Sequence, residues 1–253
     1  MSDDEQPAEI QAVSRAAQIL ALFAPDTPEI TPAFAAARLG LNRSTAHRYC
    51  TSLAAAGLLE RGHEQGTWAP GGLLLQLGAY ALGRRRVLDL APPHMRALAA
   101  GSHMTTVLSL WGSGGPVVFR VEEDITRTVL VTVRVGTHLP LDSAQAAAFL
   151  AFHGDQLMVS RLLSGLPRDE RERIVAGADR VRETGSSVAV TTDGVVAIGA
   201  PVFDEYGICA TLALIGTDNT LSAHNDGPEK AMLLSTARGL TKEMGGQYRP
   251  DDD

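Results

Sequence analysis

The fold of the first part of the chain is decided by the stretch Leu39-Gly40-Leu41-Asn42-Arg43-Ser44-Thr45-Ala46-His47-Arg48-Tyr49-Cys50-Thr51-Ser52-Leu53. Gly40 has no Cβ, so it can adopt the positive φ at which a helix ends. Asn42 and Ser44 are short polar residues that suit the cap of a following helix. From Ala46 onward, apolar residues recur every three or four positions and therefore share one side of that helix. An apolar back and a donor-rich front predict the recognition helix of a helix-turn-helix, the part that enters DNA.

The neighbouring segments complete a winged helix. Residues 12–23 have helical periodicity, and the proline-containing run after them ends that helix because proline cannot continue it. A threonine and a first-turn proline then begin a short helix over residues 31–38. Two short extended pieces at 58–61 and 67–69 flank a turn with a glycine at each end. They predict a two-stranded hairpin, the wing.

Residues 72–82 are apolar at helical period and are followed by Arg84-Arg85-Arg86. Because this stretch precedes a change in composition, we expect a linker helix whose apolar stripe packs on a second copy of itself. The alternative is a helix that packs on its own domain. The three arginines form either a solvated face, which we favour, or a second contact with phosphate.

The remainder of the chain has an α+β pattern. β-branched runs bounded by glycine or acidic turns predict strands, and stretches of period 3.6 predict helices. The expected helices are 92–100, 143–153, 155–163, 168–183 and 227–244, and the expected strands are 105–111, 117–122, 129–135, 187–191, 196–203 and 208–216. We expect an antiparallel sheet with helices to one side and a sensory cavity.

Charge is distributed unevenly along the chain. The net charge of the 253 residues is −7, which taken alone argues against DNA binding. However, residues 11–89 contain eight arginines against five acidic residues, whereas residues 90–253 contain fourteen Lys and Arg against twenty acidic residues. A basic N-terminal module attached to an acidic body suits a DNA-binding module with a regulatory partner domain.

Cysteine usage and the lack of targeting signals indicate a cytoplasmic protein. Cys50 and Cys209 are far apart, which excludes a disulfide framework. The acidic N-terminus does not resemble a signal peptide, and no stretch approaches the roughly 20 apolar residues of a membrane span. No His or Cys spacing indicates a metal site, and no cofactor is predicted.

Segments in both parts of the chain carry a resemblance to one family. Residues 13–23, 40–48 and 53–59 in the first part, and 135–141 and 197–204 in the second, resemble motifs of the IclR family of bacterial transcription regulators. This resemblance implies a winged helix-turn-helix joined by a linker helix to a GAF-like α/β effector-binding domain. It also implies a homodimer or a dimer of dimers.

The expected domain boundaries follow from the resemblance and from the change in composition. They are a disordered tail at 1–9, the winged helix-turn-helix at 10–70, a linker and dimerisation helix at 71–90, the effector-binding domain at 91–247 and an acidic tail at 248–253.

The departures from the family pattern lie in the effector domain. Val190 stands where the family usually has glutamate, and alanines at 146–148 replace a Gly-Lys pair in a segment that is one residue shorter. Pro201, Ala213 and Ile215 occupy cavity positions that are often Ser or Cys in relatives. We therefore expect a less polar cavity than in relatives that bind small keto acids.

The candidate DNA-binding residues lie on the recognition helix, the first helix and the wing. Arginine can pair with guanine, and Ser, Thr and His reach phosphates or base edges. We assign Ser44, Thr45 and Arg48 to the groove, with Arg43 and His47 beside them, and Arg15, His63 and Gln65 to the DNA backbone. The alternative is an ordinary solvated helix face.

The candidate effector-binding residues are matched through the two family segments of the second part. They are Leu139, Ser143, Gln145, Thr191, Pro201, Ala213 and Ile215. A cavity between a sheet and a helix with a few polar groups can hold a small organic molecule. Core packing is the alternative for each of them.

No enzymatic signature is present. There is no nucleophile elbow, and the glycine-rich residues 112–115 lack the Walker spacing and its lysine. We therefore predict a regulator rather than an enzyme: a repressor whose binding to double-stranded promoter DNA is switched by a small organic effector. The alternatives are an activator of the same family and a small-molecule enzyme with a vestigial DNA-binding module.

Overall fold

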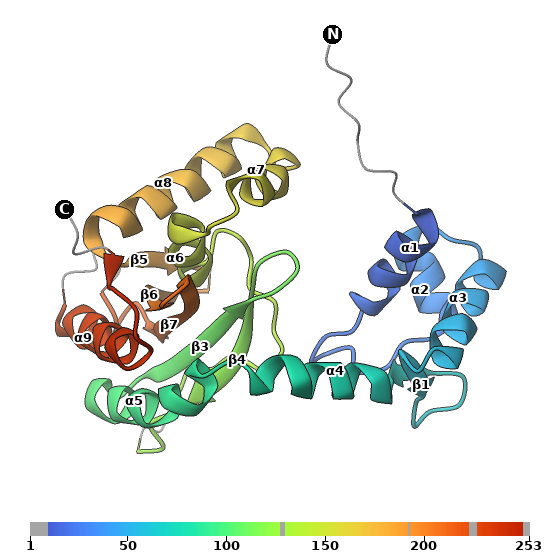
Figure 1. The fold of residues 1–253 in the computed structure, drawn as a ribbon, viewed down its shortest axis with the longest axis horizontal. Helices are drawn as coiled ribbons and strands as arrows, with labels where there is room; N and C mark the ends of the chain where they lie inside the picture. Colours follow the sequence, from blue (N-terminus) through green and yellow to red (C-terminus); the bar gives the residue numbers. More distant parts are fainter. Residues whose placement is uncertain (1–9, 127–129, 192, 223–226, 250–253) are drawn as a thin grey trace, which may run out of the picture. The chain divides into compact units, whose positions relative to one another are not determined.

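A computed structural model describes residues 10–126, 130–191, 193–222 and 227–249 of the chain. The chain divides into two compact units, and the boundary lies between Arg84 and Arg85 (Figure 1). Each unit has a hydrophobic core of its own.

The first unit is a helix-turn-helix with a hairpin. Its elements are α1 (Gln11–Leu20), α2 (Pro32–Leu39), α3 (Arg43–Ala55), β1 (Leu59–Arg61), β2 (Trp68–Pro70) and α4 (Gly72–Gly83). The turn has the expected chemistry, since Gly40 ends α2 with a φ of 64° and the Asn42 side chain accepts a hydrogen bond from the Thr45 amide. Ala46, Cys50 and Leu53 of α3 are buried, as the apolar periodicity predicts.

Helix α4 is apolar but has no buried residue. Leu75 is 77% exposed and Tyr80 is 68% exposed. The alternative in which this helix packs on its own domain is therefore not observed. The helix ends at Gly83, and the last residues of the expected linker, from Val87 on, belong to the next helix in the second unit.

The second unit is built on one antiparallel sheet with the strand order β4-β3-β7-β6-β5. Its strands are β3 (Thr105–Trp111), β4 (Pro116–Glu122), β5 (Ser187–Val190), β6 (Val195–Asp204) and β7 (Gly207–Thr217). Its helices are α5 (Val87–Ser102), α6 (Ala144–Phe152), α7 (Gln156–Ser164), α8 (Arg168–Thr184) and α9 (Pro228–Glu243).

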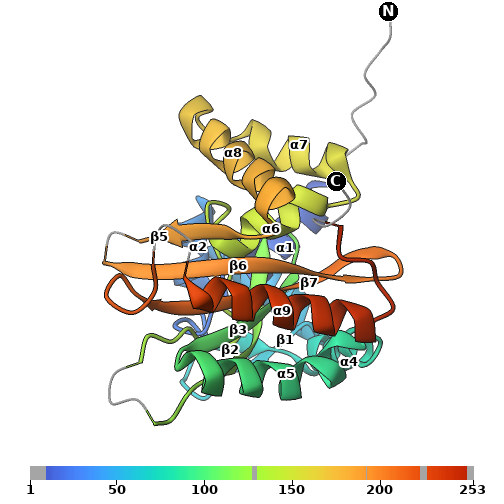
Figure 2. The ribbon, with the colours of Figure 1, turned by 90° about the vertical axis from the view of Figure 1, so that its left-hand side faces the viewer.

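Helices cover both faces of this sheet, so the expectation of helices on one side is wrong (Figure 2). Helices α5 and α9 pack on one face, and α6, backed by α8, packs on the other. The reason lies in the central strands β6 and β7, which are apolar at successive positions and not only at alternate ones. A strand of that kind is stable only when both of its faces are buried.

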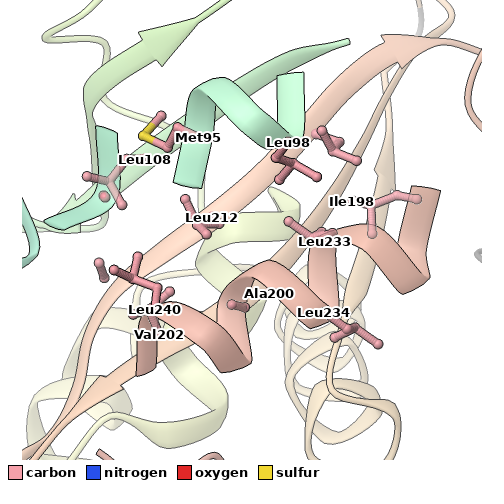
Figure 3. Close-up of a cluster of buried hydrophobic side chains, with 14 of the residues drawn as sticks. Met95, Leu98, Leu108, Ile198, Ala200, Val202, Leu212, Leu233, Leu234 and Leu240 are labelled. Carbon is pink, nitrogen blue, oxygen red and sulfur yellow. The ribbon is translucent and has the colours of Figure 1, made fainter. Parts of the chain in front are cut away.

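The larger core lies between the sheet and the pair α5 and α9 (Figure 3). Met95 and Leu98 of α5 and Leu233 and Leu240 of α9 meet the apolar side chains of β6 and β7 there. The opposite face carries a smaller core formed by α6, α7 and α8.

Helix α5 begins at Val87 and not at the two prolines where we expected it to begin. Pro92 and Pro93 lie inside the helix, where each removes a backbone hydrogen bond. Burial of Val87, Ala91 and Met95 along one side of the helix outweighs that loss.

The expected strand at 129–135 is also wrong for its described part, because residues 130–135 form no strand. The outer edge of β4 already has a partner. Val118 exchanges backbone hydrogen bonds with Gly136 and Thr137, and the Leu139 amide donates to the Pro116 carbonyl. Residues 136–139 thus take the place beside the start of β4, and the Val131 carbonyl accepts from the Thr105 hydroxyl at 2.5 Å.

The expected acidic tail at 248–253 starts too early. Tyr248 packs on Phe203 with ring centroids 5.7 Å apart, and its hydroxyl donates to the Gly185 carbonyl at 3.2 Å. The remaining residues of the two expected tails, 1–9 and 250–253, lie outside the described residues.

Candidate nucleic-acid interface and effector site

The outward face of α3 carries most of the predicted DNA-binding residues. Arg43, Ser44, His47 and Arg48 are exposed, and Thr45 is half-buried beside α1. The Ser44 hydroxyl donates to Asn42 Oδ1 at 2.8 Å, so its oxygen remains available as an acceptor.

Sequence reasoning missed two residues of this face. Thr51 and Ser52 are exposed one turn beyond Arg48. The helical spacing contained the signal, because residues at i, i+4 and i+7 from Ser44 share a side of a helix. The face thus extends over two turns rather than one.

The positive charges of this face are not neutralised within the protein. In the described part of the chain, the side chains of Arg43 and Arg48 form no hydrogen bond or ion pair. Neither α1 nor α3 contains an acidic residue. The face is therefore ready to bind phosphate groups, which supply most of the affinity of DNA-binding proteins.

A groove of about 490 Å³ separates α1 from α3 beside Arg48. Its lining residues are Ala12, Ala16, Thr45, Arg48, Tyr49, Ser52 and Leu53. Arg15 lies on α1, half-buried, and donates to the Gln18 side chain at 2.9 Å.

The wing presents His63 and Gln65 as exposed side chains on the turn between β1 and β2. The Glu29 carboxylate, from the loop before α2, accepts hydrogen bonds from the His63 amide at 2.8 Å and from the Thr67 hydroxyl at 2.6 Å. These bonds hold the pKa of the Glu29 carboxyl below its ordinary value. Sequence reasoning did not identify Glu29, because nothing local links it to a turn more than thirty residues later.

Three of the predicted effector-binding residues meet between α6 and the sheet. Pro201 of β6 pairs with Thr211 of β7, and the next pair on the same face contains Ala213. Gln145 of α6 is buried and donates from Nε2 to the Thr211 hydroxyl at 3.3 Å.

Ser109 of β3 lies beside this group and was missed by sequence reasoning. It pairs with Thr211 across the sheet, is fully buried, and its hydroxyl has no hydrogen-bond partner among the described residues. The hydroxyl of Thr106 has none either, and Thr106 faces the α5 side. A buried polar group without a partner costs about 1–3 kcal/mol, so it marks a place where a ligand could supply the missing bond. The available signal was a serine between two leucines of an expected strand, Leu108 and Leu110.

The other predicted effector-binding residues lie elsewhere. Ser143 caps α6 and lines a cavity of about 360 Å³ against α8 and β5, whereas Ile215 lines another of about 400 Å³ at the start of β3. Leu139 is half-buried in the loop before α6, and Thr191 is exposed just after β5. The structure therefore does not gather all seven residues into one cavity.

A histidine and a carboxylate are hydrogen-bonded at the start of β3. His103 Nδ1 and Asp124 Oδ2 are 2.6 Å apart, and the Thr126 amide and hydroxyl also donate to Asp124. His103 and Thr126 together lower the pKa of Asp124 from its ordinary 3.8 to about 2. The pair ties the loop after β4 to the end of α5, where His103 has a φ of 56°.

Two further searches concern metals and membranes. Within residues 10–126, 130–191, 193–222 and 227–249, no group of three or more His, Cys, Asp or Glu side chains is placed to hold a metal ion. Over the same residues, no helix combines the length and the apolar character that a bilayer span requires.

Comparison with known proteins agrees with this geometry. A family model, the IclR helix-turn-helix domain, matches residues 12–63. The DNA-binding transcriptional repressor YiaJ of Escherichia coli K12 is 24% identical over 263 residues, covering 98% of this chain and 93% of the relative. The transcriptional repressor IclR of the same organism is 23% identical over 251 residues, covering 94% and 91%.

Solved structures share the fold of the whole chain. An IclR family transcriptional regulator from Brucella abortus matches with a TM-score of 0.74 at 19% identity, covering 96% of both chains. An IclR homolog from Microbacterium hydrocarbonoxydans, complexed with 4-hydroxybenzoate, matches with a TM-score of 0.68 at 23% identity, covering 92% of this chain and 98% of that one. The predicted α+β fold with an N-terminal helix-turn-helix is confirmed.

The relatives also bear on the class of function. They are transcriptional regulators, which confirms the prediction that this protein is not an enzyme. The helix-turn-helix, the unneutralised arginines of α3 and the shared fold support the same class of function. The chain carries an IclR-type helix-turn-helix domain and is similar over nearly its whole length to DNA-binding transcriptional regulators of the IclR family.

Proposed function

We propose that the protein is a cytoplasmic, homo-oligomeric repressor that leaves its promoter site when it binds a small organic effector. The observation that carries the proposal is the outward face of α3, which is exposed and positive and whose arginines form no hydrogen bond or ion pair within the described residues. Repression agrees with the names of the relatives YiaJ and IclR, both of which are described as repressors.

The DNA contacts are divided between base edges and backbone. Arg48, with Ser44 and Thr45, lies where an inserted α3 would meet base edges in the major groove. Arg43 and His47 flank them. Arg15 on α1 and the wing residues His63 and Gln65 lie outside the helix face and contact phosphates.

The working unit is a dimer, or a dimer of dimers, held in part by α4. Leu75, Leu77 and Tyr80 of this helix are exposed, and an exposed apolar helix is buried when two copies pair. In a symmetric pair the two α3 helices meet half-sites about 34–36 Å apart, so the operator is pseudo-palindromic. In this assignment residues 10–70 bind DNA, 71–90 link and dimerise, and 91–247 bind the effector.

The effector site is the buried polar group between α6 and the sheet, with Gln145, Thr211 and the unpartnered Ser109 hydroxyl at its centre. Pro201 and Ala213 make its walls apolar, which favours an aromatic or aliphatic ligand with one or two polar groups. Leu139, Ser143, Thr191 and Ile215 lie elsewhere and are not assigned to this site. The ligand shifts DNA affinity by binding the DNA-free arrangement more tightly than the DNA-bound one.

The test is fluorescence anisotropy of the full-length protein with the DNA upstream of its own gene and with a scrambled duplex. We expect tighter binding to the upstream fragment, and a steep loss of affinity between about 50 and 200 mM salt. Equal affinity for both duplexes would contradict the proposal. Transcription from the same fragment, with and without protein, then distinguishes repression from activation.

A small-molecule library tests the effector, with 4-hydroxybenzoate as one member because a relative is complexed with it. A compound that raises the melting temperature and weakens operator binding supports the switch. If compounds stabilise the protein but leave operator affinity unchanged, ligand control of DNA binding is refuted.

A further inference from the structure

The wing turn is held by little regular structure. Strands β1 and β2 have three residues each, and the turn from Gly62 to Thr67 lies beyond them. A two-stranded hairpin of this length is marginal in water, so its shape depends on contacts from outside the hairpin. Within the turn, Gly62 bonds to Thr67 and Thr67 to Glu64 through the backbone, and the contacts from outside it come from the loop before α2.

The carboxylate of Glu29 reaches across the turn with both of its oxygens. Oε1 accepts from the His63 amide at 2.8 Å, and Oε2 accepts from the Thr67 hydroxyl at 2.6 Å and from the Glu64 amide at 3.4 Å. Thr67 is only 7% exposed, so the strongest of these bonds is shielded from water. One side chain thus satisfies donors at both ends of the turn.

The position of Glu29 is itself fixed by the core of the first unit. The next residue, Ile30, is buried, and it exchanges two backbone hydrogen bonds with Trp68 at 2.8 and 2.9 Å. Gly62 completes the fit, because a Cβ at that position would collide with Glu29 Oε2 and Thr67 Oγ1. The carboxylate is therefore connected to the core on one side and to the wing on the other.

The charge of Glu29 is unusual for its location. An acidic side chain near a DNA-binding surface repels phosphate, and its removal alone is expected to strengthen binding. The side chain of Glu64, on the same turn, is exposed and forms no hydrogen bond within the described residues. Two acidic residues thus lie at the wing turn, Glu29 beside it and Glu64 on it, and only the Glu29 carboxylate accepts hydrogen bonds from the turn.

We propose that Glu29 is a positioning residue for DNA binding, which holds the wing turn so that His63 and Gln65 meet the DNA backbone in a preformed shape. This inference rests on the proposed function. It predicts that replacing Glu29 weakens DNA binding, whereas removal of a negative charge alone would strengthen it. The reason is that disruption of the turn's shape outweighs the loss of one negative charge.

The test compares Glu29→Gln with the matched control Glu64→Gln in the full-length protein, since each removes one negative charge from the wing. We expect Glu29→Gln to weaken operator binding about 3- to 10-fold and to lower the salt slope by about one for each phosphate that the wing no longer binds. Glu64→Gln should leave binding unchanged or tighten it. If Glu29→Gln binds as tightly as the wild type, the proposal is overturned.

Amide hydrogen exchange separates failure of this proposal from failure of the proposed function. In the DNA-free protein, we expect the amides of His63 and Glu64 to exchange at least about tenfold faster in Glu29→Gln, with the α3 amides unchanged. Unchanged exchange at both residues would refute the positioning role whatever the DNA result. Thr67→Val, which removes the shielded donor, should accelerate the same two amides.

Discussion

Helices α3 and α8 both carry several arginines but use them in opposite ways. On α8, Arg168, Arg173 and Arg182 pair with acidic residues three or four positions away, at 2.7, 3.4 and 2.5 Å. On α3, Arg43 and Arg48 have no acidic neighbour, because the helix contains none. The arginines of α8 are therefore balanced by acidic residues of the same helix, whereas the two arginines of α3 leave an open positive surface in the first unit.

The difference shows that the local arrangement of charge decides function more than the total does. The net charge of −7 would repel DNA if it were spread evenly. However, charges separated by more than a Debye length of about 8–10 Å are largely screened at physiological salt. The field at α3 is therefore set mainly by nearby charges, and because α1 and α3 contain no acidic residue, the arginines of α3 can attract phosphate.

The largest expected effect comes from α4, the exposed apolar helix of the first unit. Leu75→Asp combined with Leu77→Asp should abolish pairing and weaken operator binding by about 10²- to 10⁴-fold, because two linked half-sites bind far more tightly than one. Sedimentation velocity and anisotropy measure the two effects. The control is Leu157→Asp, an equally exposed leucine on α7 of the second unit. If Leu157→Asp also dissociates the protein, the effect is not specific to α4, and the two units do not differ in their contribution to pairing.

The arginine comparison itself is tested by single substitutions. Arg48→Ala should weaken operator binding by about 1–3 kcal/mol if the side chain reads a base. Arg168→Ala on α8 removes the same charge from a paired position and should have no effect on anisotropy. An unchanged affinity and footprint for Arg48→Ala would remove this residue from the interface.

Ser109 is an exception within the second unit, where most buried polar groups find partners. Ser109→Ala should raise the free energy of unfolding by about 1–3 kcal/mol, because it removes a buried hydroxyl that has no partner among the described residues. Thr211→Val should lower it by about 1 kcal/mol, because Gln145 then loses its partner. Urea denaturation measures both. A destabilised Ser109→Ala protein would show that the hydroxyl is already satisfied.

The smallest expected effect concerns the hydrogen-bonded pair of His103 and Asp124, a carboxylate with partners in the second unit. The pKa of Asp124 is lowered from 3.8 to about 2, so the pair stabilises the fold above pH 3.8 and is lost as the pH falls through about 2. Asp124→Asn should therefore be less stable than the wild type at pH 7. The difference should shrink between pH 4 and pH 2. Thermal unfolding across that range tests this, and a constant difference would contradict it.

The helix-turn-helix was predictable because its signals are local. Gly40 ends one helix, Asn42 caps the next, and the spacing of apolar residues in α3 indicates which side of that helix is buried. Most strands and helices of the second unit were predictable for the same reason. The family motifs then gave the order of the two parts.

The rest depends on contacts between distant segments. Pro92 and Pro93 are helix breakers by local rules, and only burial along α5 explains their position. Residues 130–135 have strand composition but form no strand, and it is residues 136–139 that bond to β4. The same reason applies to Ser109 and Glu29, whose roles come from partners in other elements. Candidate effector residues chosen by position in a motif were consequently divided among several places.

The prolines of α5 have a consequence for the junction between the two units. Without amide hydrogens at 92 and 93, the carbonyls of Leu88 and Asp89 gain no helical bond, so the first turn depends on Val87 and Ala91 packing inward. Unwinding that turn would break few backbone bonds. A helical residue advances about 1.5 Å and an extended one about 3.3 Å, so four unwound residues lengthen the tether by about 7 Å. A tether of adjustable length would let one dimer fit operators whose half-sites differ in separation.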